Sequence, residues 1–140
     1  MNETVASLSP PQRRALLAVE PNPDGRLDYV VDIKGEVAGP AASKIQIMVT
    51  LRYIPDKFVL TPGSFGQYLR MIETLHLGSL EVLATTILND LNNELVSRWL
   101  SVSLASPAAI HPGVQSHSVT LEDRQPNWNN QGLLSRLRPY

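Results

Sequence analysis

The sequence of 140 residues contains no cysteine, and this absence excludes several kinds of site at once. Without a thiol, the chain cannot form disulfide bonds, use a thiolate nucleophile or hold zinc through cysteine ligands. It also lacks any apolar run near the roughly 20 residues of a membrane-spanning helix, and its N-terminus shows no signal-peptide pattern. We therefore expect a cytoplasmic protein with no membrane contact.

An excess of charge of either sign is lacking too. Twelve basic residues stand against 13 acidic residues, which leaves a formal net charge of -1. Nucleic-acid binding depends on clustered basic side chains that displace condensed counterions, so we expect no nucleic-acid surface. With 43% hydrophobic and 18% charged residues, the composition indicates a globular chain, and its length predicts one domain.

Apolar and polar residues alternate in two runs that predict strands. From Leu27 onward, one face of the first run carries Tyr29, Val31, Ile33 and Val37. The second run covers 44–53, with Ile45, Ile47, Val49, Leu51 and Tyr53 on one face. Turn-forming residues at 39–43 separate the runs, so we expect the two strands to pair antiparallel with one face toward a core.

The apolar period changes to 3.6 residues after the second strand, which predicts two helices. We expect Ser64 to cap the first, with Gln67 completing a capping box, and Gly78 to end it in the left-handed conformation. Ser79 is expected to cap the second helix. The apolar face of the first helix is Phe65, Leu69, Ile72 and either Leu75 or His76, and that of the second is Leu80, Leu83, Ala84, Ile87, Leu91, Leu95 and Trp99.

Alternation returns at 100–105 and 116–121, which completes the order ββααββ. The sequence thus predicts an α+β fold, a four-stranded antiparallel sheet with two helices on one face. We expect an N-terminal arm at 1–26, a domain at 27–122 and a mobile or partner-docked C-terminal tail at 123–140. The edges of such a sheet carry no run of blunting lysines, so we expect edge-to-edge joining into a homo-oligomeric ring.

Four short motifs lie between residues 20 and 105. They are Asn22-Pro23-Asp24-Gly25-Arg26-Leu27-Asp28-Tyr29, Leu51-Arg52-Tyr53-Ile54-Pro55-Asp56-Lys57, Ser64-Phe65-x-x-Tyr68-Leu69, and Glu81 followed by Leu88-Asn89-Asp90-Leu91. In order and spacing they resemble the 7-cyano-7-deazaguanine nitrile reductase family of the tunnelling fold, to which GTP cyclohydrolase I also belongs. The resemblance implies ββααββ subunits in a ring around a tunnel, with purine- or pterin-like ligands bound between subunits.

The parts that perform reduction in that family have no counterpart here. The family's cysteine aligns with Ala38, which has no nucleophilic atom, and its aspartate falls near Lys44 or Ile45. Its nicotinamide-cofactor run corresponds to 61–66, where both cofactor-binding lysines are glycines. We therefore expect no bound cofactor and no nitrile reduction.

Glu81 is the site residue that the resemblance retains, because it aligns with the glutamate that holds the ligand ring in this fold. The two oxygens of a carboxylate match the parallel N–H donors of a guanine-like edge, and a helix N-terminus favours the charged form. The alternative is that Glu81 only interacts with the helix dipole at a solvated helix start.

His76 lies close to a family histidine and is a second candidate ligand-binding residue. A histidine that interacts with the C-terminal helix dipole is the alternative. His111 and His117 belong to no shared motif, and no His-x-x-x-His spacing occurs, so we expect no metal site.

Three hypotheses about function remain. The first is a module that binds a purine-, pterin- or deazaguanine-like heterocycle through Glu81. The second is an enzyme of queuosine, deazapurine or pterin metabolism with different chemistry on the same ligands, for which His76, Lys57 and Lys44 are weak catalytic candidates. The third is a structural oligomer with a vestigial pocket, in which the tail from Trp128 to Tyr140 docks on a neighbour.

Overall fold

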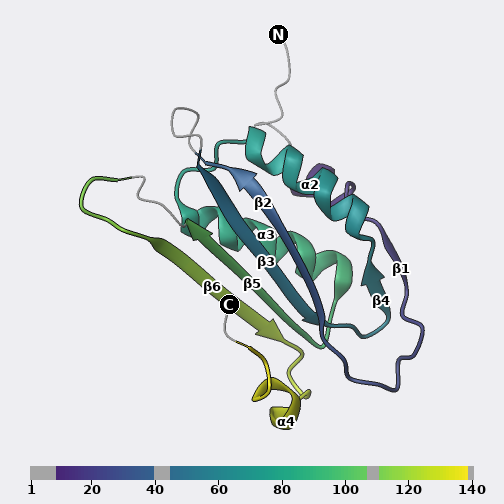
Figure 1. The fold of residues 1–140 in the computed structure, drawn as a ribbon. Coiled ribbons are helices and arrows are strands. Elements are labelled where there is room, and N and C mark those ends of the chain that lie inside the picture. The colour runs from purple at the N-terminus through teal and green to yellow at the C-terminus, as the bar shows by residue number, and fades with distance from the viewer. Residues whose placement is uncertain (1–8, 40–44, 107–110, 139–140) are drawn as a thin grey trace.

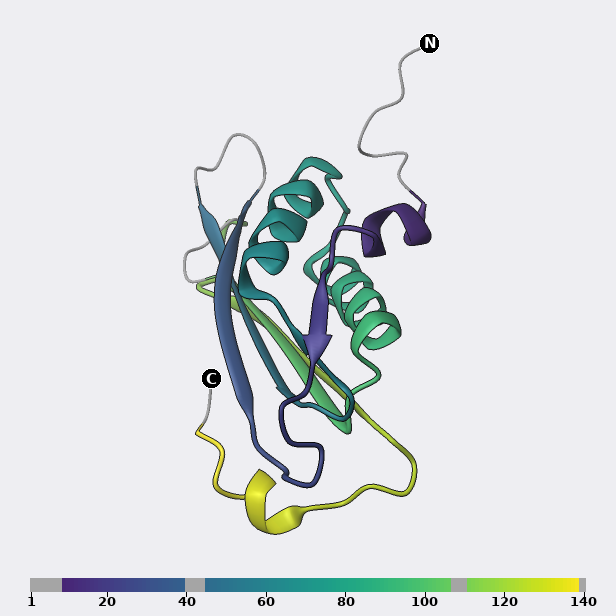
Figure 2. The same ribbon diagram turned by 90° about the vertical axis from the view of Figure 1, so that its right-hand side faces the viewer.

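The computed structural model describes residues 9–39, 45–106 and 111–138, which form a sheet layer and a helical layer (Figure 1). The main sheet is antiparallel, in the order β2 (Val31–Ala38), β3 (Gln46–Ile54), β5 (Trp99–Ser106) and β6 (His117–Arg124). Helices α2 (Pro62–Thr74) and α3 (Leu80–Leu95) cover one face of it (Figure 2). The α+β class and the ββααββ order predicted from the sequence are confirmed.

The segment before the main sheet adds helix α1 (Pro10–Arg14) and strand β1 (Val19–Pro21). Strand β1 pairs antiparallel with β4 (Phe58–Leu60) in a separate two-stranded sheet. Helix α1 is fastened to α3 by Arg13, whose Nε lies 2.9 Å from Oδ2 of Asp90. The hydroxyl of Tyr68 on α2 donates to the same oxygen at 2.5 Å, so one buried carboxylate joins three helices.

The hydrophobic core lies between the sheet and its two helices. Alternation in β3 and β5 directs one set of side chains into it, and the helices supply the other set. The buried side chains include Ile47, Val49, Leu51, Tyr53, Leu100, Val102 and Leu104 from the sheet, and Phe65, Leu69, Ile72, Leu83, Ile87, Leu91 and Leu95 from the helices. The sequence pattern predicted these residues, but Trp99, expected on the second helix, begins β5 instead, and Leu75, not His76, completes the buried face of α2.

One glycine is required where α2 crosses β2. A Cβ atom added at Gly35 would lie 2.6 Å from Cδ1 of the buried Leu69, which is closer than van der Waals contact allows. The absence of a side chain at this position thus brings the helix close to the edge strand.

The ends of α2 differ from the prediction. The helix begins at Pro62 with Thr61 as N-cap, because proline has the φ of a first helical residue and no N–H to satisfy. Ser64 therefore lies in the first turn, where its Oγ accepts the N–H of Ala18 at 3.0 Å. After the helix, His76 and not Gly78 takes the left-handed conformation, with φ of 52°.

Helix α3 begins as predicted. The Oγ of Ser79 accepts the N–H of Val82 at 3.1 Å, which satisfies one of the free donors of the first turn. Within the described ranges, no helix has the length and apolar character to cross a membrane.

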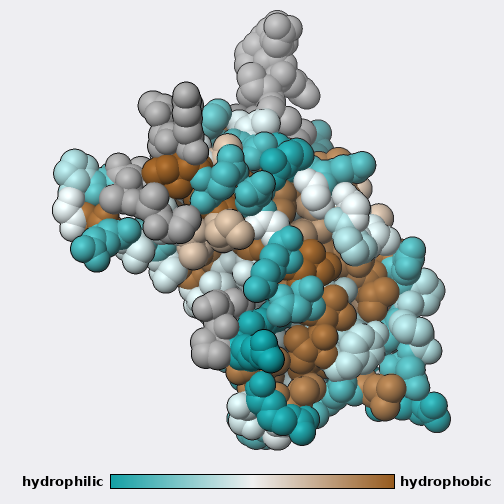
Figure 3. All heavy atoms as spheres, viewed as in Figure 1, coloured by the Kyte–Doolittle hydropathy of each residue, from teal (hydrophilic) through white to brown (hydrophobic). Residues whose placement is uncertain are grey.

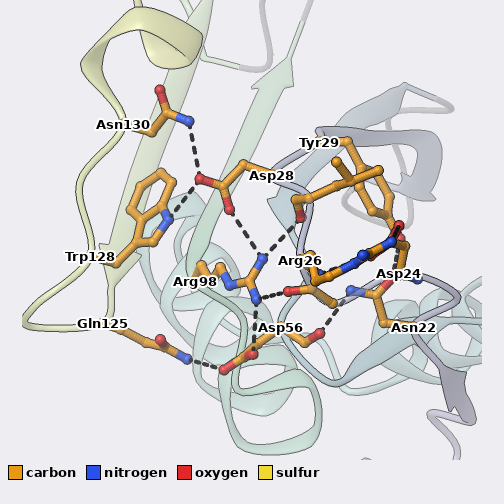
Figure 4. A network of polar contacts seen from close by, with 12 residues as sticks. Asn22, Asp24, Arg26, Asp28, Tyr29, Asp56, Arg98, Gln125, Trp128 and Asn130 are labelled. Atoms are coloured by element: carbon orange, nitrogen blue, oxygen red, sulfur yellow. Dashed lines mark hydrogen bonds and ion pairs between the residues drawn. The ribbon is translucent and has the colours of Figure 1, made fainter.

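The segment after β6 runs along one end of the sheet and includes helix α4 (Gln131–Leu134). Asp28 accepts hydrogen bonds from Trp128 Nε1 at 3.1 Å and Asn130 Nδ2 at 3.0 Å, and it also pairs with Arg98 (Figure 4). Further along, the carbonyl of Arg138 accepts from the guanidinium of Arg52 on the outer sheet face. These contacts hold the described part of the tail against its own domain.

Val96 offers a test of backbone strain, because it follows α3 in the left-handed conformation with φ of 45°. Its side chain is 57% exposed, and its two hydrogen bonds, to Asn92 O and from Gln125 Nε2, use backbone atoms that glycine retains. We expect Val96→Gly to raise the free energy of unfolding by about 1 kcal/mol. Glycine removes the strain of the left-handed conformation in the folded state, and this gain exceeds the loss from the greater conformational entropy of glycine in the unfolded chain. Urea denaturation measures this.

The matched control for this prediction is Val82→Gly. Val82 is also an exposed valine but lies within α3, where glycine is the poorer helix former, so this substitution should lower stability. A loss of stability in Val96→Gly of the same size as in Val82→Gly would contradict the prediction.

Candidate ligand-binding pocket

A pocket of about 410 Å³ opens at the end of the sheet where β2 and β5 end and β6 begins. Its apolar lining comes from the sheet, the two helices and the segment before β6, and includes Val37, Ile47, Ile72, Leu77, Leu80, Leu83 and Val114. Small-molecule sites have volumes of roughly 300–1,000 Å³ and a mainly apolar lining with few polar groups. The pocket therefore has the size and character of a site for one small organic molecule.

All three histidines of the sequence line this pocket. His76 follows the C-terminal end of α2, whereas His111 precedes β6 and His117 begins it. They meet because the end of α2 and the start of β6 lie at the same end of the sheet. In the part of the chain that the structure describes, no three histidine or acidic side chains are arranged to hold a metal ion.

Glu73 is the one carboxylate among the described residues that line the pocket. It lies in the last turn of α2, and its side chain is 20% exposed. Its Oε2 accepts the N–H of Ala38 at 2.8 Å, and its Oε1 lies 3.5 Å from Arg70. The contact with Ala38 fixes the carboxylate at the end of β2.

Glu81 lies beside the pocket and is not among the described residues that line it. Its Oε2 is 3.1 Å from Nε2 of His117, which does line the pocket, so the two form a rim pair. The side chain of Glu81 is 60% exposed. A hydrogen bond with its own backbone N–H, and then the contact with His117, lower the pKa of Glu81 and keep it charged.

The other sequence candidates are placed as follows. His76 lines the pocket and is exposed, and Ala38, which aligns with the family's cysteine, lines it too. Lys57 is exposed between β3 and β4 and does not belong to the described lining. Lys44 lies outside the described residues. Of the candidates, the structure thus brings His76 and Glu81 to one end of the fold.

Three lining residues were not predicted to bind a ligand: Glu73 was not considered, and His111 and His117 were considered only as metal ligands. Glu73 belongs to no motif and resembles an ordinary polar residue at the end of a helix. His111 and His117 reach the pocket through contacts between distant parts of the chain. The sequence could have pointed to His117 through its position, because it lies at the start of the last predicted strand, at the same end of the sheet as the end of α2.

The rim pair predicts a change in titration. In His117→Gln, the pKa of Glu81 should rise toward its ordinary value but stay below it, because the larger cause, the backbone hydrogen bond, is retained. NMR titration of the glutamate side-chain carboxyls in isotope-labelled protein measures this pKa. His111→Gln is the control and should leave it unchanged, since Glu81 contacts His117. An unshifted pKa in His117→Gln would show that the rim pair does not form.

Comparisons with known proteins gave one kind of match. No family model matches the chain, and no curated protein sequence matches it. Among solved structures, the chain is similar to the crystal structure of the archaeosine synthase QueF-Like in the apo form. The TM-score is 0.45 at 24% sequence identity, and the match covers 68% of this chain and 91% of that one.

Proposed function

We propose that the pocket binds a flat purine-, pterin- or deazaguanine-like heterocycle, with Glu81 receiving hydrogen bonds from an N–H edge of the ring. The observation that carries the proposal is the apolar pocket of about 410 Å³ with an ionised carboxylate at its rim. Leucine, isoleucine and valine side chains contact the faces of such a ring, and the few polar groups orient it. We expect no nitrile reduction, because Ala38, which the resemblance aligns with the reductases' cysteine, carries only a methyl group.

The charge and the position of the rim pair, Glu81 and His117, both suit hydrogen bonding to the ligand ring. Glu81 is ionised at neutral pH, and its lowered pKa extends the charged form to lower pH, so its oxygens can accept hydrogen bonds from a neutral ligand. His117 belongs both to the rim pair and to the pocket lining, and it links the carboxylate to the space that the ring would fill.

The same proposal includes a homo-oligomer. In the described part of the chain, β2 and β6 each have one neighbouring strand and form the two edges of the sheet. The core extends to both edges through half-buried residues, Val31 and Ile33 on β2 and Val119 and Leu121 on β6. Figure 3 shows apolar surface along the lower half of β2.

Strand direction permits edges from two copies to join. The four strands alternate in direction, so β6 of one copy and β2 of the next can pair antiparallel without a break in the pattern. Each junction uses two different edges, and such head-to-tail contacts close into rings when the rotation permits. A neighbouring subunit would then cover exposed groups near the pocket, including Glu81.

A second candidate function is catalysis of a different reaction on the same ligand class. The observation that favours it is the set of proton-transfer groups in the pocket, namely His76, His111, His117 and Glu73. Imidazole and carboxylate groups perform general acid–base chemistry near neutral pH. Turnover of a bound pterin or deazaguanine would distinguish this candidate from binding alone.

We expect 7-deazaguanine or guanine to raise the melting temperature of the protein, because a ligand of the folded state stabilises it by mass action. Glu81→Gln should weaken binding by about tenfold or more, since a hydrogen bond to a charged group is lost and an amide N–H faces the donor edge. Calorimetric titration measures the affinity. The matched control is Glu36→Gln, which removes an exposed carboxylate from β2 outside the described lining.

Two results would contradict this proposal. Equal affinity of Glu81→Gln and the parent protein would remove the role of Glu81. If no purine or pterin at millimolar concentration shifts the melting temperature, the function is not binding of this class, and the structural oligomer is favoured.

The homo-oligomer is tested separately. Light scattering of the purified protein should give a mass that is a multiple of 15.4 kDa. Val119→Lys places a charge at the β6 edge and should shift the protein toward the monomer. Gln67→Lys, which adds the same charge on the exposed surface of α2, should not. A monomeric parent protein at micromolar concentration would refute the ring.

A further inference from the structure

The position of Glu73 is electrostatically unfavourable for a glutamate that only forms part of a helix. It lies in the last turn of α2, where the negative end of the helix dipole disfavours a carboxylate. Its side chain is four-fifths buried and lines a pocket whose walls are mainly apolar, so part of its hydration is lost. A residue that breaks local rules in this way is expected at functional sites.

The contacts of Glu73 hold its carboxylate in place but do not occupy all of its hydrogen-bond acceptor sites. An ionised carboxylate has about four sites that can accept a hydrogen bond. The N–H of Ala38 occupies one on Oε2, and the exposed Arg70 lies 3.5 Å from Oε1. Each oxygen thus keeps a site for a further donor. Because the Ala38 N–H belongs to the end of a sheet strand, it holds the carboxylate in a fixed place.

On the basis of the proposed function, we infer that Glu73 is a second ligand-recognition residue, which accepts a hydrogen bond from an N–H on a different edge of the ring from the one held by Glu81. The two carboxylates lie on different helices, Glu73 at the end of α2 and Glu81 at the start of α3. One is inside the pocket lining and the other at its rim.

This arrangement defines the ligand class more narrowly. A ring held by two carboxylates needs N–H donors on two edges, as in a guanine-like free base with donors on both its six-membered and five-membered rings. A substituent on the five-membered-ring nitrogen removes one donor, so Glu73 keeps its contacts with Ala38 and Arg70 but gains no hydrogen bond from the ligand in a partly desolvated place. The pocket therefore selects the free base over its N9-substituted derivatives.

Calorimetric titration of the full chain with 7-deazaguanine and with its 9-methyl derivative tests this inference. The parent protein should bind 7-deazaguanine at least about tenfold more tightly than the 9-methyl derivative, which cannot donate a hydrogen bond from N9 to the charged Glu73. In Glu73→Gln this preference should fall to about threefold or less. The amide oxygen can still accept the Ala38 N–H, so the variant should keep its fold.

Each outcome bears on a different claim. If the parent protein binds neither compound, both the proposed function and this inference are overturned. If it binds both equally, or if Glu73→Gln keeps the full preference, only the inference about Glu73 is overturned. The comparison of the two ligands on the parent protein needs no variant, so the test stands even if Glu73→Gln does not fold. Glu36→Gln is the control and should retain the parent preference.

Discussion

The short reversal between α2 and α3 is the constraint on which both the core and the pocket depend. Residues 75–79 turn the chain so that two consecutive helices lie on the same face of the sheet. Leu75 packs in the core, and His76 takes the left-handed conformation that changes the direction of the chain. Because the reversal is short, the end of one helix and the start of the next border one pocket, which brings Glu73 and Glu81 to the same end of the fold.

The buried Asp90 constrains the same two helices from within. A charge that is 1% exposed is tolerated only with partners, and Asp90 has the guanidinium of Arg13 and the hydroxyl of Tyr68. One partner comes from α1 and the other from α2, whereas Asp90 itself lies on α3. Burial, followed by the charge of Asp90, raises the pKa of Tyr68, so this hydroxyl stays a donor at ordinary pH. The network thereby fixes how the helices that border the pocket lie relative to each other.

The features that the sequence predicts correctly are those set by interactions between residues close together along the chain. Alternation at 45–53 identified the buried face of β3, because the burial of side chains has the period of the backbone itself. The cap at Ser79 was correct for a similarly local reason. At Ser64 two local signals competed, and the proline at the first helical position determined the helix start.

The candidate site was less predictable, because its residues meet through tertiary contacts. His111 and His117 lie more than thirty residues from His76 in the sequence, and only the closing of the sheet brings all three to one pocket. Glu73 has no signal in its neighbours along the chain. Its importance comes from the Ala38 N–H, which reaches it from a strand that ends 35 positions earlier.

The charges around the pocket favour a neutral ligand over a phosphorylated one. No lysine or arginine is among the described lining residues, and the guanidinium of Arg70 is already close to Glu73 and to the carbonyl of Glu36. A phosphate would approach a carboxylate on the lining and another at the rim, without the charge-assisted donors that usually bind it. Under the proposed function, a neutral ring with N–H donors would satisfy the same carboxylates, so we expect a free heterocycle and not a nucleotide as the ligand.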